Sequence, residues 1–291
     1  MNEPDVSVVV PCFAVGSELS DQIRALAAQQ FPGRFEVVLS DNGGNDDLRS
    51  RAAALSSSTA LDIRMVDATD VRGVSHARNI GLRASRAPLV AICDADDEVS
   101  PQWLASLVEA AADHALVGGA IDTVRLNSEV TRAWRPGPAQ DALPRKLDHL
   151  PYAMGCNLVV HRERALAIGG WREDYVAGGD DVDFAWRMQK AGASPGFAPA
   201  AVVHYRYRDD LRATAKQMYA YARCDALLLR DYRADGARPK RLRDTIRELH
   251  WLVGRARDLR GPTGPRGRWL CRAAAVVGRA AGSIKHRQWA G

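Results

Sequence analysis

The sequence lacks any long apolar run. A helix that spans a bilayer needs about 20 consecutive, mostly apolar residues, and no such run occurs among the 291 residues, although 46% of them are hydrophobic. We therefore expect a chain that buries its apolar residues in one large core, with room for an appendage. The first residues are acidic and lead directly into an apolar strand, so we expect no secretory leader.

Cysteine is sparse and scattered. The five cysteines, Cys12, Cys93, Cys156, Cys224 and Cys271, form no C-x-x-C pair. This distribution predicts reduced, buried thiols rather than disulfides or a zinc site. We accordingly expect a cytoplasmic protein, with peripheral attachment at the inner face of the membrane as the alternative.

Positive charge is unevenly distributed. Residues 206–291 hold 21 Lys and Arg against 8 Asp and Glu, whereas the rest of the chain holds 19 against 27. A basic tail favours a polyanionic or membrane-surface partner, with an ordinary solvated helix as the alternative. No zinc-finger, homeodomain or RNA-binding signature accompanies this charge, which argues against nucleic acid as a partner.

Apolar strands and amphipathic helices alternate in the first hundred residues. The predicted strands are 6–11, 35–40, 61–66, 89–93 and 197–205, and the predicted helices are 17–30, 48–55, 75–84, 180–190, 209–232, 240–258 and 267–283. The βαβα order predicts a mainly parallel sheet covered by helices. Residues 127–151 are rich in proline and predict a long surface loop, and the Gly-Pro-rich residues 261–265 predict a linker.

An acidic cluster follows the predicted strand 89–93. Asp94 and Asp96 are two residues apart, so in an extended chain their side chains point the same way. Two adjacent carboxylates require a cation, a proton or a donor-rich ligand, because like charges repel. At the carboxyl end of a strand in an α/β sheet, a hard cation on a phosphate is the natural candidate. A solvated acidic turn is the alternative.

Several motifs occur in a fixed order along residues 5–208. They are Val6–Pro11, Asp41–Asp46, Arg78–Gly81, Asp94–Asp97, Gly169–Trp171, Gly179–Asp183 and Val202–His204. In content, order and spacing they resemble the inverting family-2 glycosyltransferases of the GT-A fold. The resemblance implies a GT-A catalytic domain over residues 1–208, with a mainly parallel sheet flanked by helices, and a basic helical C-terminal extension over 209–291.

The resemblance implies transfer of one sugar from a nucleotide-diphosphate sugar to an acceptor hydroxyl. The acceptor is a saccharide, a lipid-linked glycan or a small natural product. By analogy Asp96 coordinates a divalent metal, Asp94 lies nearer the ribose, and His204 is a further metal ligand. Oxygen ligands with one imidazole suit Mn²⁺ or Mg²⁺ better than Zn²⁺. A structural histidine after a strand is the alternative for His204.

The same resemblance places a general base in the acidic pair Asp180 and Asp181. Asp181 inherits the role of the family's second acid, which deprotonates the acceptor, and Asp180 is a possible sugar or acceptor contact. The alternative is a helix start enriched in acids, which stabilise the positive end of the helix dipole. Three acids within four residues exceed what capping requires, so we favour catalysis.

The remaining positions concern nucleotide and sugar binding. Pro11, Asp41 and Arg78 match the family's nucleotide-binding positions, although a turn aspartate is the alternative for Asp41 and a surface ion pair for Arg78. Trp171 matches a sugar or acceptor platform, with a core tryptophan as the alternative. The Q-x-x-R-W signature of processive relatives is absent, which predicts one sugar per binding event.

Two other functions compete with this interpretation. A haloacid-dehalogenase-like phosphatase also places D-x-D after an apolar strand, but Glu98 stands where that family has Thr or Val, and Lys146 is the only lysine between the acidic clusters. A non-catalytic adaptor of the same fold would be expected to lose Asp96, Asp181 or His204.

The final predicted helix carries a basic stripe. Arg268, Arg272 and Arg279 fall on one side of a helix through Trp269–Ile284. Such a helix can lie on an anionic bilayer. An ordinary amphipathic helix packed on the catalytic domain is the alternative.

Overall fold

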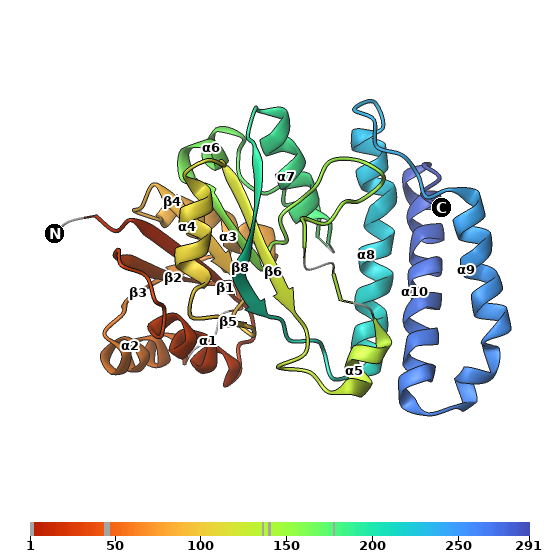
Figure 1. Cartoon of the computed structure of the whole chain (residues 1–291), viewed down its shortest axis with the longest axis horizontal. Helices are drawn as coiled ribbons and strands as arrows, with labels where there is room; N and C mark the ends of the chain where they lie inside the picture. Colours follow the sequence, from red (N-terminus) through yellow and green to blue (C-terminus); the bar gives the residue numbers. More distant parts are fainter. Residues whose placement is uncertain (1–2, 44–46, 136, 139–140, 177) are drawn as a thin grey trace.

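The computed structural model describes residues 3–43, 47–135, 137–138, 141–176 and 178–291. Its centre is a mixed eight-stranded sheet of order β3-β2-β1-β4-β7-β6-β8-β5 (Figure 1). The strands are β1 Val6–Cys12, β2 Phe35–Asp41, β3 Asp62–Asp67, β4 Leu89–Cys93, β5 Glu98–Val99, β6 Leu116–Asp122, β7 Asn157–His161 and β8 Pro195–His204. Strands β1 to β4 are mutually parallel, and β6 is parallel to β8, whereas β7 and β5 are antiparallel to their neighbours. The predicted mainly parallel sheet is confirmed.

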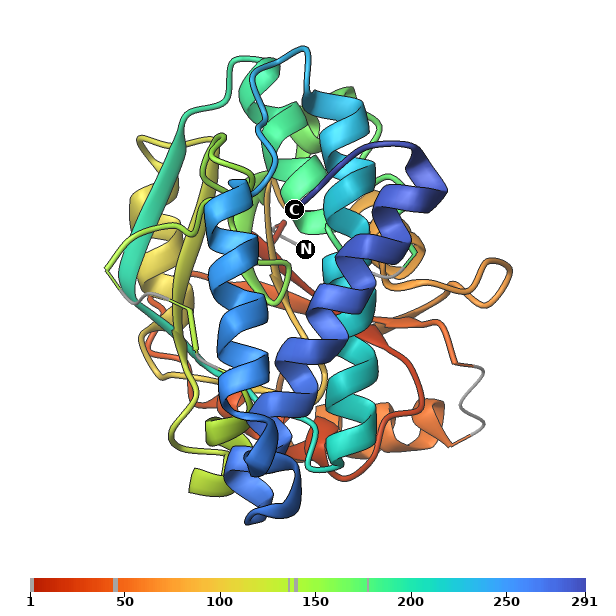
Figure 2. The ribbon, with the colours of Figure 1, turned by 90° about the vertical axis from the view of Figure 1, so that its right-hand side faces the viewer.

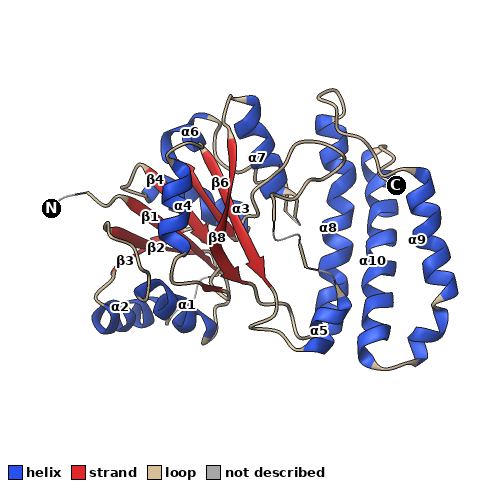
Figure 3. Ribbon diagram, in the orientation of Figure 1, coloured by secondary structure: helices blue, strands red, loops and turns tan. Residues whose placement is uncertain are grey.

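Helices cover both faces of the sheet (Figure 3). They are α1 Glu18–Ala27, α2 Leu48–Thr59, α3 Val74–Ala84, α4 Trp103–Ala111, α5 Glu129–Trp134, α6 Arg162–Ala167 and α7 Asp180–Lys190. Alternate residues of β1 point to opposite faces: Val8 joins the core beneath α1, α2 and α4, and Val9 joins the core beneath α3, α6 and α7. Because both faces are buried, the central strands β1 and β4 are apolar almost throughout.

The basic C-terminal part forms a layer of helices beside the sheet domain (Figures 1 and 2). It contains α8 Leu211–Tyr232, α9 Leu242–Gly254, the short 3-10 helix η1 Ala256–Arg260 and α10 Thr263–His286. Helices α8 and α10 pack closely because Gly278 and Gly282 of α10 face backbone carbonyls of Tyr219 and Arg223 on α8. None of the described helices is both long enough and apolar enough to cross a bilayer.

Three local expectations are corrected. The predicted surface loop 127–151 contains α5, whose Trp134 is buried and donates from Nε1 to Thr263 O of α10 (3.2 Å); Pro136, Ala139 and Gln140 lie outside the described residues. The predicted linker 261–265 is only partly a linker, because α10 already begins at Thr263. Strands β6 and β7 lie in segments for which the sequence indicated no strand.

Two of the three arginines of the basic stripe on α10, Arg272 and Arg279, face the protein, whereas Arg268 is exposed. Arg279 is buried and pairs with Glu248 of α9, while the Arg272 guanidinium lies 4.2 Å from the ring centroid of Trp251. Arg268 donates to Ala133 O (2.9 Å). These interactions agree with the packed helix, which the sequence slightly favoured, and membrane docking through α10 stays a prediction.

Candidate active site

The acidic cluster lies where β4 ends, beside the chain that leaves β8. Asp94 is half-buried, Asp96 is exposed and Asp97 is buried. Arg206 holds this turn: its backbone N–H donates to Asp97 Oδ1 (2.7 Å), and its Nε donates to Asp96 O (2.8 Å). Asp97 Oδ1 therefore joins two strand ends, and Asp94 and Asp96 are the acids of this cluster that line a cavity.

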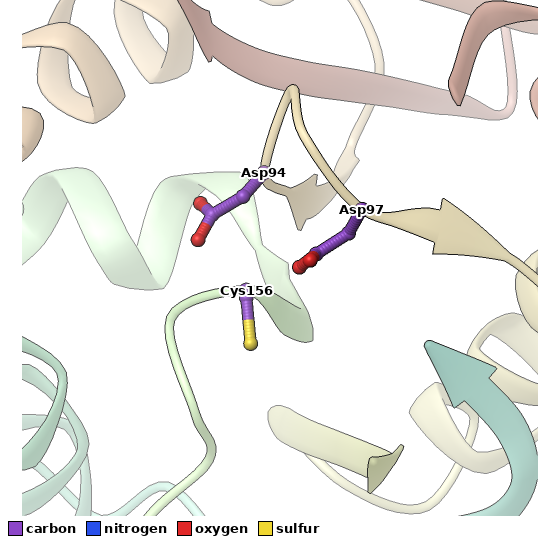
Figure 4. Close-up of side chains that lie close together, drawn as sticks. All are labelled: Asp94, Asp97 and Cys156. Carbon is purple, nitrogen blue, oxygen red and sulfur yellow. The ribbon is translucent and has the colours of Figure 1, made fainter. Parts of the chain in front are cut away.

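Asp94, Asp97 and Cys156 lie close together, with ligand atoms within 4.8 Å of one another (Figure 4). One oxygen of Asp97, Oδ2, is buried without a hydrogen-bond partner in the structure. Burial, together with the charges of Asp94 and Asp97, raises the pKa of the Cys156 thiol, so it stays protonated and is a poor metal ligand. The carboxylates therefore suit an oxygen-preferring cation such as Mn²⁺ or Mg²⁺ better than Zn²⁺.

Asp96, like Asp94, lines a cavity. Limited hydration in that cavity, followed by the charge of Asp94, raises the pKa of Asp96 to about 6. Arg206 and Arg208 act in the opposite direction. A carboxylate with unfavourable like-charge neighbours gains from a bound cation, which agrees with the predicted metal-binding role of Asp96.

Arg78 connects the two acidic motifs. It is buried on α3, and its Nη1 donates to Asp180 Oδ2 (2.7 Å) while its Nη2 donates to Asp94 Oδ1 (3.3 Å). Gly155 makes room for this arrangement, because a Cβ there would lie 2.7–2.8 Å from the guanidinium. The structure thus places a fixed positive charge between acids that are 86 residues apart in the chain.

Asp180 and Asp181 begin α7 with different surroundings. Asp180 is buried, and burial raises its pKa while Arg78 acts to lower it. Asp181 is half-buried and accepts from its neighbour Val182 N (2.8 Å) and from Gly155 N (3.3 Å). Asp181 lines a cavity from which an acceptor hydroxyl can approach, whereas Asp180 is committed to Arg78.

Two cavities meet at Asp94. One, of about 1010 Å³, is lined by Pro11, Phe13, Asn42 and Asp96. The other, of about 940 Å³, is lined by Asp180, Asp181 and residues of α8. The residues common to both are Arg72, Val74, Asp94, Val176 and Arg208. The acids predicted to bind the donor and the acceptor therefore open into separate but adjoining spaces.

His204 is oriented by an acid that the sequence did not single out. Its Nδ1 lies 2.7 Å from Asp122 Oδ2, at the paired ends of β8 and β6. The residues that line the two cavities include Arg206 and Arg208 rather than His204. The metal-ligand role of His204 stays a prediction, and Arg206 is the residue of this segment that contacts the acidic turn.

The nucleotide-side residues fall in two groups. Pro11 and Arg78 line the cavities, as does Asn42, which the sequence did not single out. Asp41 ends β2 and accepts from Gly43 N (3.1 Å), the turn interaction of the alternative interpretation. The nucleotide-binding role of Asp41 stays a prediction.

Trp171 is a core residue, which corrects the expectation of a sugar platform. It is 1% exposed, and its ring stacks on Phe184 with centroids 3.9 Å apart. Asn79 fixes its backbone from both sides, donating to Trp171 O and accepting from Trp171 N (both 2.8 Å). No sugar can reach a face buried in this way.

Sequence reasoning also missed several cavity residues. Arg72 lies over the half-exposed ring of Phe13, 4.6 Å from its centroid. Lys146, from the segment predicted as a surface loop, pairs with Asp225 of α8 (2.7 Å) and lines the cavity of Asp181. Arg206 and Arg208 line the cavity of Asp96 as well. Their repeat in Tyr205-Arg206-Tyr207-Arg208 was the signal that the sequence offered for them.

Comparison with known proteins identifies the family. The sequence profile of Glycosyl transferase family 2 matches residues 7–166, and that of Glycosyl transferase family group 2 matches residues 89–263. This chain belongs to glycosyltransferase family 2. The arrangement of its sheet and helices confirms the GT-A fold.

Several relatives of this family-2 glycosyltransferase are known. The succinoglycan biosynthesis protein ExoM of Rhizobium meliloti (strain 1021) is 30% identical over 64% of this chain and 62% of its own. The pre-mycofactocin glycosyltransferase of Mycobacterium tuberculosis (strain H37Rv) is 28% identical over 72% of this chain and 44% of its own. The chain thus spans less than two thirds of the length of these curated relatives.

Among solved structures, the mannosyltransferase PcManGT from Pyrobaculum calidifontis, in complex with GDP-Man and Mn²⁺, is similar in fold. The TM-score is 0.57 at 21% identity, and the match covers 98% of this chain and 73% of that one. TarS of S. aureus in complex with UDP-GlcNAc has a TM-score of 0.54 at 14% identity, covering 98% of this chain and 92% of that one. At these identities the likeness concerns the fold alone.

Proposed function

We propose that this glycosyltransferase moves one sugar from a nucleotide-diphosphate donor to an acceptor hydroxyl, with inversion of the anomeric carbon. The observation that carries the proposal is Arg78, buried between Asp94 and Asp180 where the two cavities meet. We assign the cavity of Asp96 to the donor and the cavity of Asp181 to the acceptor. An attack from the acceptor cavity, with departure into the donor cavity, is a single displacement and inverts configuration.

Each residue then has a defined task. Asp181 takes the proton from the attacking hydroxyl, and the N–H groups of Gly155 and Val182 fix its carboxylate. Asp96, next to Asp94, would hold the divalent cation, with Mn²⁺ and Mg²⁺ favoured by the all-oxygen set. When bound, such a cation supplies positive charge to the departing diphosphate. Arg78 keeps Asp94 and Asp180 at fixed positions beside the point where the two cavities meet.

The acceptor is a saccharide, a lipid-linked glycan or a small molecule. Its cavity is bounded by α8 of the C-terminal helices, so these helices are part of the site and not only an appendage. We also propose that the basic C-terminal part brings the enzyme to an anionic membrane surface.

Substitution of Asp181 tests the assignment of the base. Asp181→Asn should lower kcat by about 10²–10⁴-fold while donor binding is retained, because the amide cannot accept the proton. Donor binding is measured by thermal stabilisation with a panel of nucleotide sugars and Mn²⁺, and the product configuration by NMR. Asp180→Asn is the matched comparison and should reduce kcat less. Loss of donor binding in Asp181→Asn, or a product of retained configuration, would refute the assignment.

A further inference from the structure

Helix α9 exposes a line of apolar side chains. Leu242, Ile246, Leu249 and Val253 are 62%, 44%, 44% and 76% exposed. At 100° per residue they fall within about 60° of one another on the helix. Single exposed apolar residues are ordinary, but four in one continuous line are the mark of a surface that contacts something else.

The inner side of α9 is already occupied. Leu252 and Thr245 are buried, and Leu252 O accepts from Trp269 Nε1 of α10 (2.8 Å). Arg272 of α10 covers the ring of Trp251. The apolar line is therefore a second surface of α9 that is additional to its packing on α10. In Figure 2, α9 and α10 lie at the front of the molecule, on the side away from the sheet.

Basic residues border the line. Arg243, Arg247 and His250 occupy the adjoining arc of the helix, and all three are exposed. Asp244 lies 3.5 Å from Arg247 and 3.9 Å from Arg243, so it offsets one of these charges. Across residues 240–260, however, seven Lys and Arg stand against three Asp and Glu.

The basic border continues into a cavity at the start of α9. Arg241 and Arg243, on either side of Leu242 in the chain, line a cavity of about 360 Å³ with Arg238 and Lys240. The first turn of α9 thus combines an exposed apolar side chain with a concave cationic surface.

We propose that α9 docks this enzyme on an anionic lipid bilayer, with the apolar line in the headgroup boundary and the arginines on lipid phosphates. An apolar line with a cationic border matches both components of such a surface. A second copy of the chain fits less well. Four side chains fall short of the roughly 800 Å² per partner that a stable interface buries, and an antiparallel symmetric pairing brings the two cationic borders together.

Vesicle flotation with the full-length protein tests the proposal. The protein should float with phosphatidylcholine vesicles that contain phosphatidylglycerol, and not with phosphatidylcholine alone, at low salt. Ile246→Ser combined with Leu249→Ser should lower the bound fraction by about tenfold, because the apolar contact is lost at unchanged charge. The matched control is Val277→Ser with Ile284→Ser on α10, where both side chains are also exposed (57% and 81%), and it should float like the wild type.

Three results would overturn docking through α9. They are failure of the wild type to float, equal flotation of the α9 variant, and equal loss in the α10 control. A mass in light scattering that halves in the α9 variant, without vesicle binding by the wild type, would assign the line to a second copy instead. Donor-induced thermal stabilisation should be the same in all variants, so a failed proposal on docking is distinguishable from a failed proposal on catalysis.

Discussion

The two sides of the active site are built differently. On the donor side, Asp94 and Asp96 follow a buried strand, and their positions are fixed by the register of β4 with β1 and β7. On the acceptor side, the cavity of Asp181 is bounded by α8 and by the segment that carries Lys146. A strand end can place a carboxylate through local sequence alone, whereas the acceptor side depends on how separate helices pack.

This difference predicts where the enzyme tolerates variation. The acids proposed to serve the donor lie at a strand end, where a shift of register by one residue would turn every side chain to the other face. The cavity proposed for the acceptor is lined by α8, which lies outside the sheet. Arg78 joins the two sides through its contacts with Asp94 and Asp180.

The largest effect is expected on the donor side, at Asp96. Asp96→Asn removes a charged ligand from the cation that stabilises the departing diphosphate, so transfer should fall by about 10³-fold or more. Transfer is measured at several Mn²⁺ concentrations, with Asp113→Asn, an exposed aspartate elsewhere, as the control. Full activity of Asp96→Asn in the presence of a chelator would contradict the assignment.

The next effect concerns the connection between the two sides. Arg78→Lys keeps the charge, but one ammonium group cannot reproduce the planar fork that contacts both Asp94 and Asp180. We expect kcat to fall by about 10²-fold, since a misplaced reacting group costs that much. Donor affinity and kcat are measured together; a variant that loses only donor affinity would make Arg78 a nucleotide contact alone.

The sequence located the acids that line the two cavities but not the packing around them. The order of motifs pointed to Asp94, Asp96 and Asp181, whose roles stay predictions. It could not show that Trp171 is stacked on Phe184, because an aromatic residue after two glycines looks the same in a core and in a cleft. Strand β6 was missed because Gly118 and Gly119 interrupt its apolar run.

Tertiary contacts explain why glycine stands at these positions of β6, and a local sequence pattern does not reveal such contacts. A Cβ at Gly119 would collide with Ala201 O of β8 and with the Asn157 side chain. Helix α8 likewise has an amphipathic sequence, but its place beside the cavity of Asp181 and against α10 depends on which element each of its faces meets.

In the sheet domain, the buried carboxylate of Glu36 makes the free energy of unfolding depend on pH. Glu36 of β2 is fully buried and accepts from Ser7 Oγ (2.6 Å), Arg64 Nε (2.8 Å) and Arg86 Nε (2.8 Å). Burial alone would raise its pKa, but these donors lower it to about 2. Because the folded pKa lies below the ordinary value of about 4.3, Glu36 stabilises the fold above that value and loses this contribution as the pH falls toward 2.

Glu36→Gln should therefore lower the free energy of unfolding by about 3 kcal/mol at neutral pH. It should also flatten the loss of stability between about pH 5 and pH 2. Urea unfolding over this range measures both effects. If the variant loses stability between these pH values as steeply as the wild type, other carboxylates account for the loss.

The smallest effect is expected in the helical part, at Gly278. A Cβ there would collide with Tyr219 O of α8, so Gly278→Ala should separate α8 from α10 and cost about 1–3 kcal/mol, even though alanine favours a helix by about 1 kcal/mol. Gly254→Ala is the matched control. Gly254 ends α9 with no atom within 4 Å of the added Cβ, so this substitution should not destabilise the protein.

Because α8 bounds the acceptor cavity, Gly278→Ala should raise the KM for acceptor and leave donor affinity unchanged. Equal changes in both affinities would show that the helical part supports the whole site rather than its acceptor side.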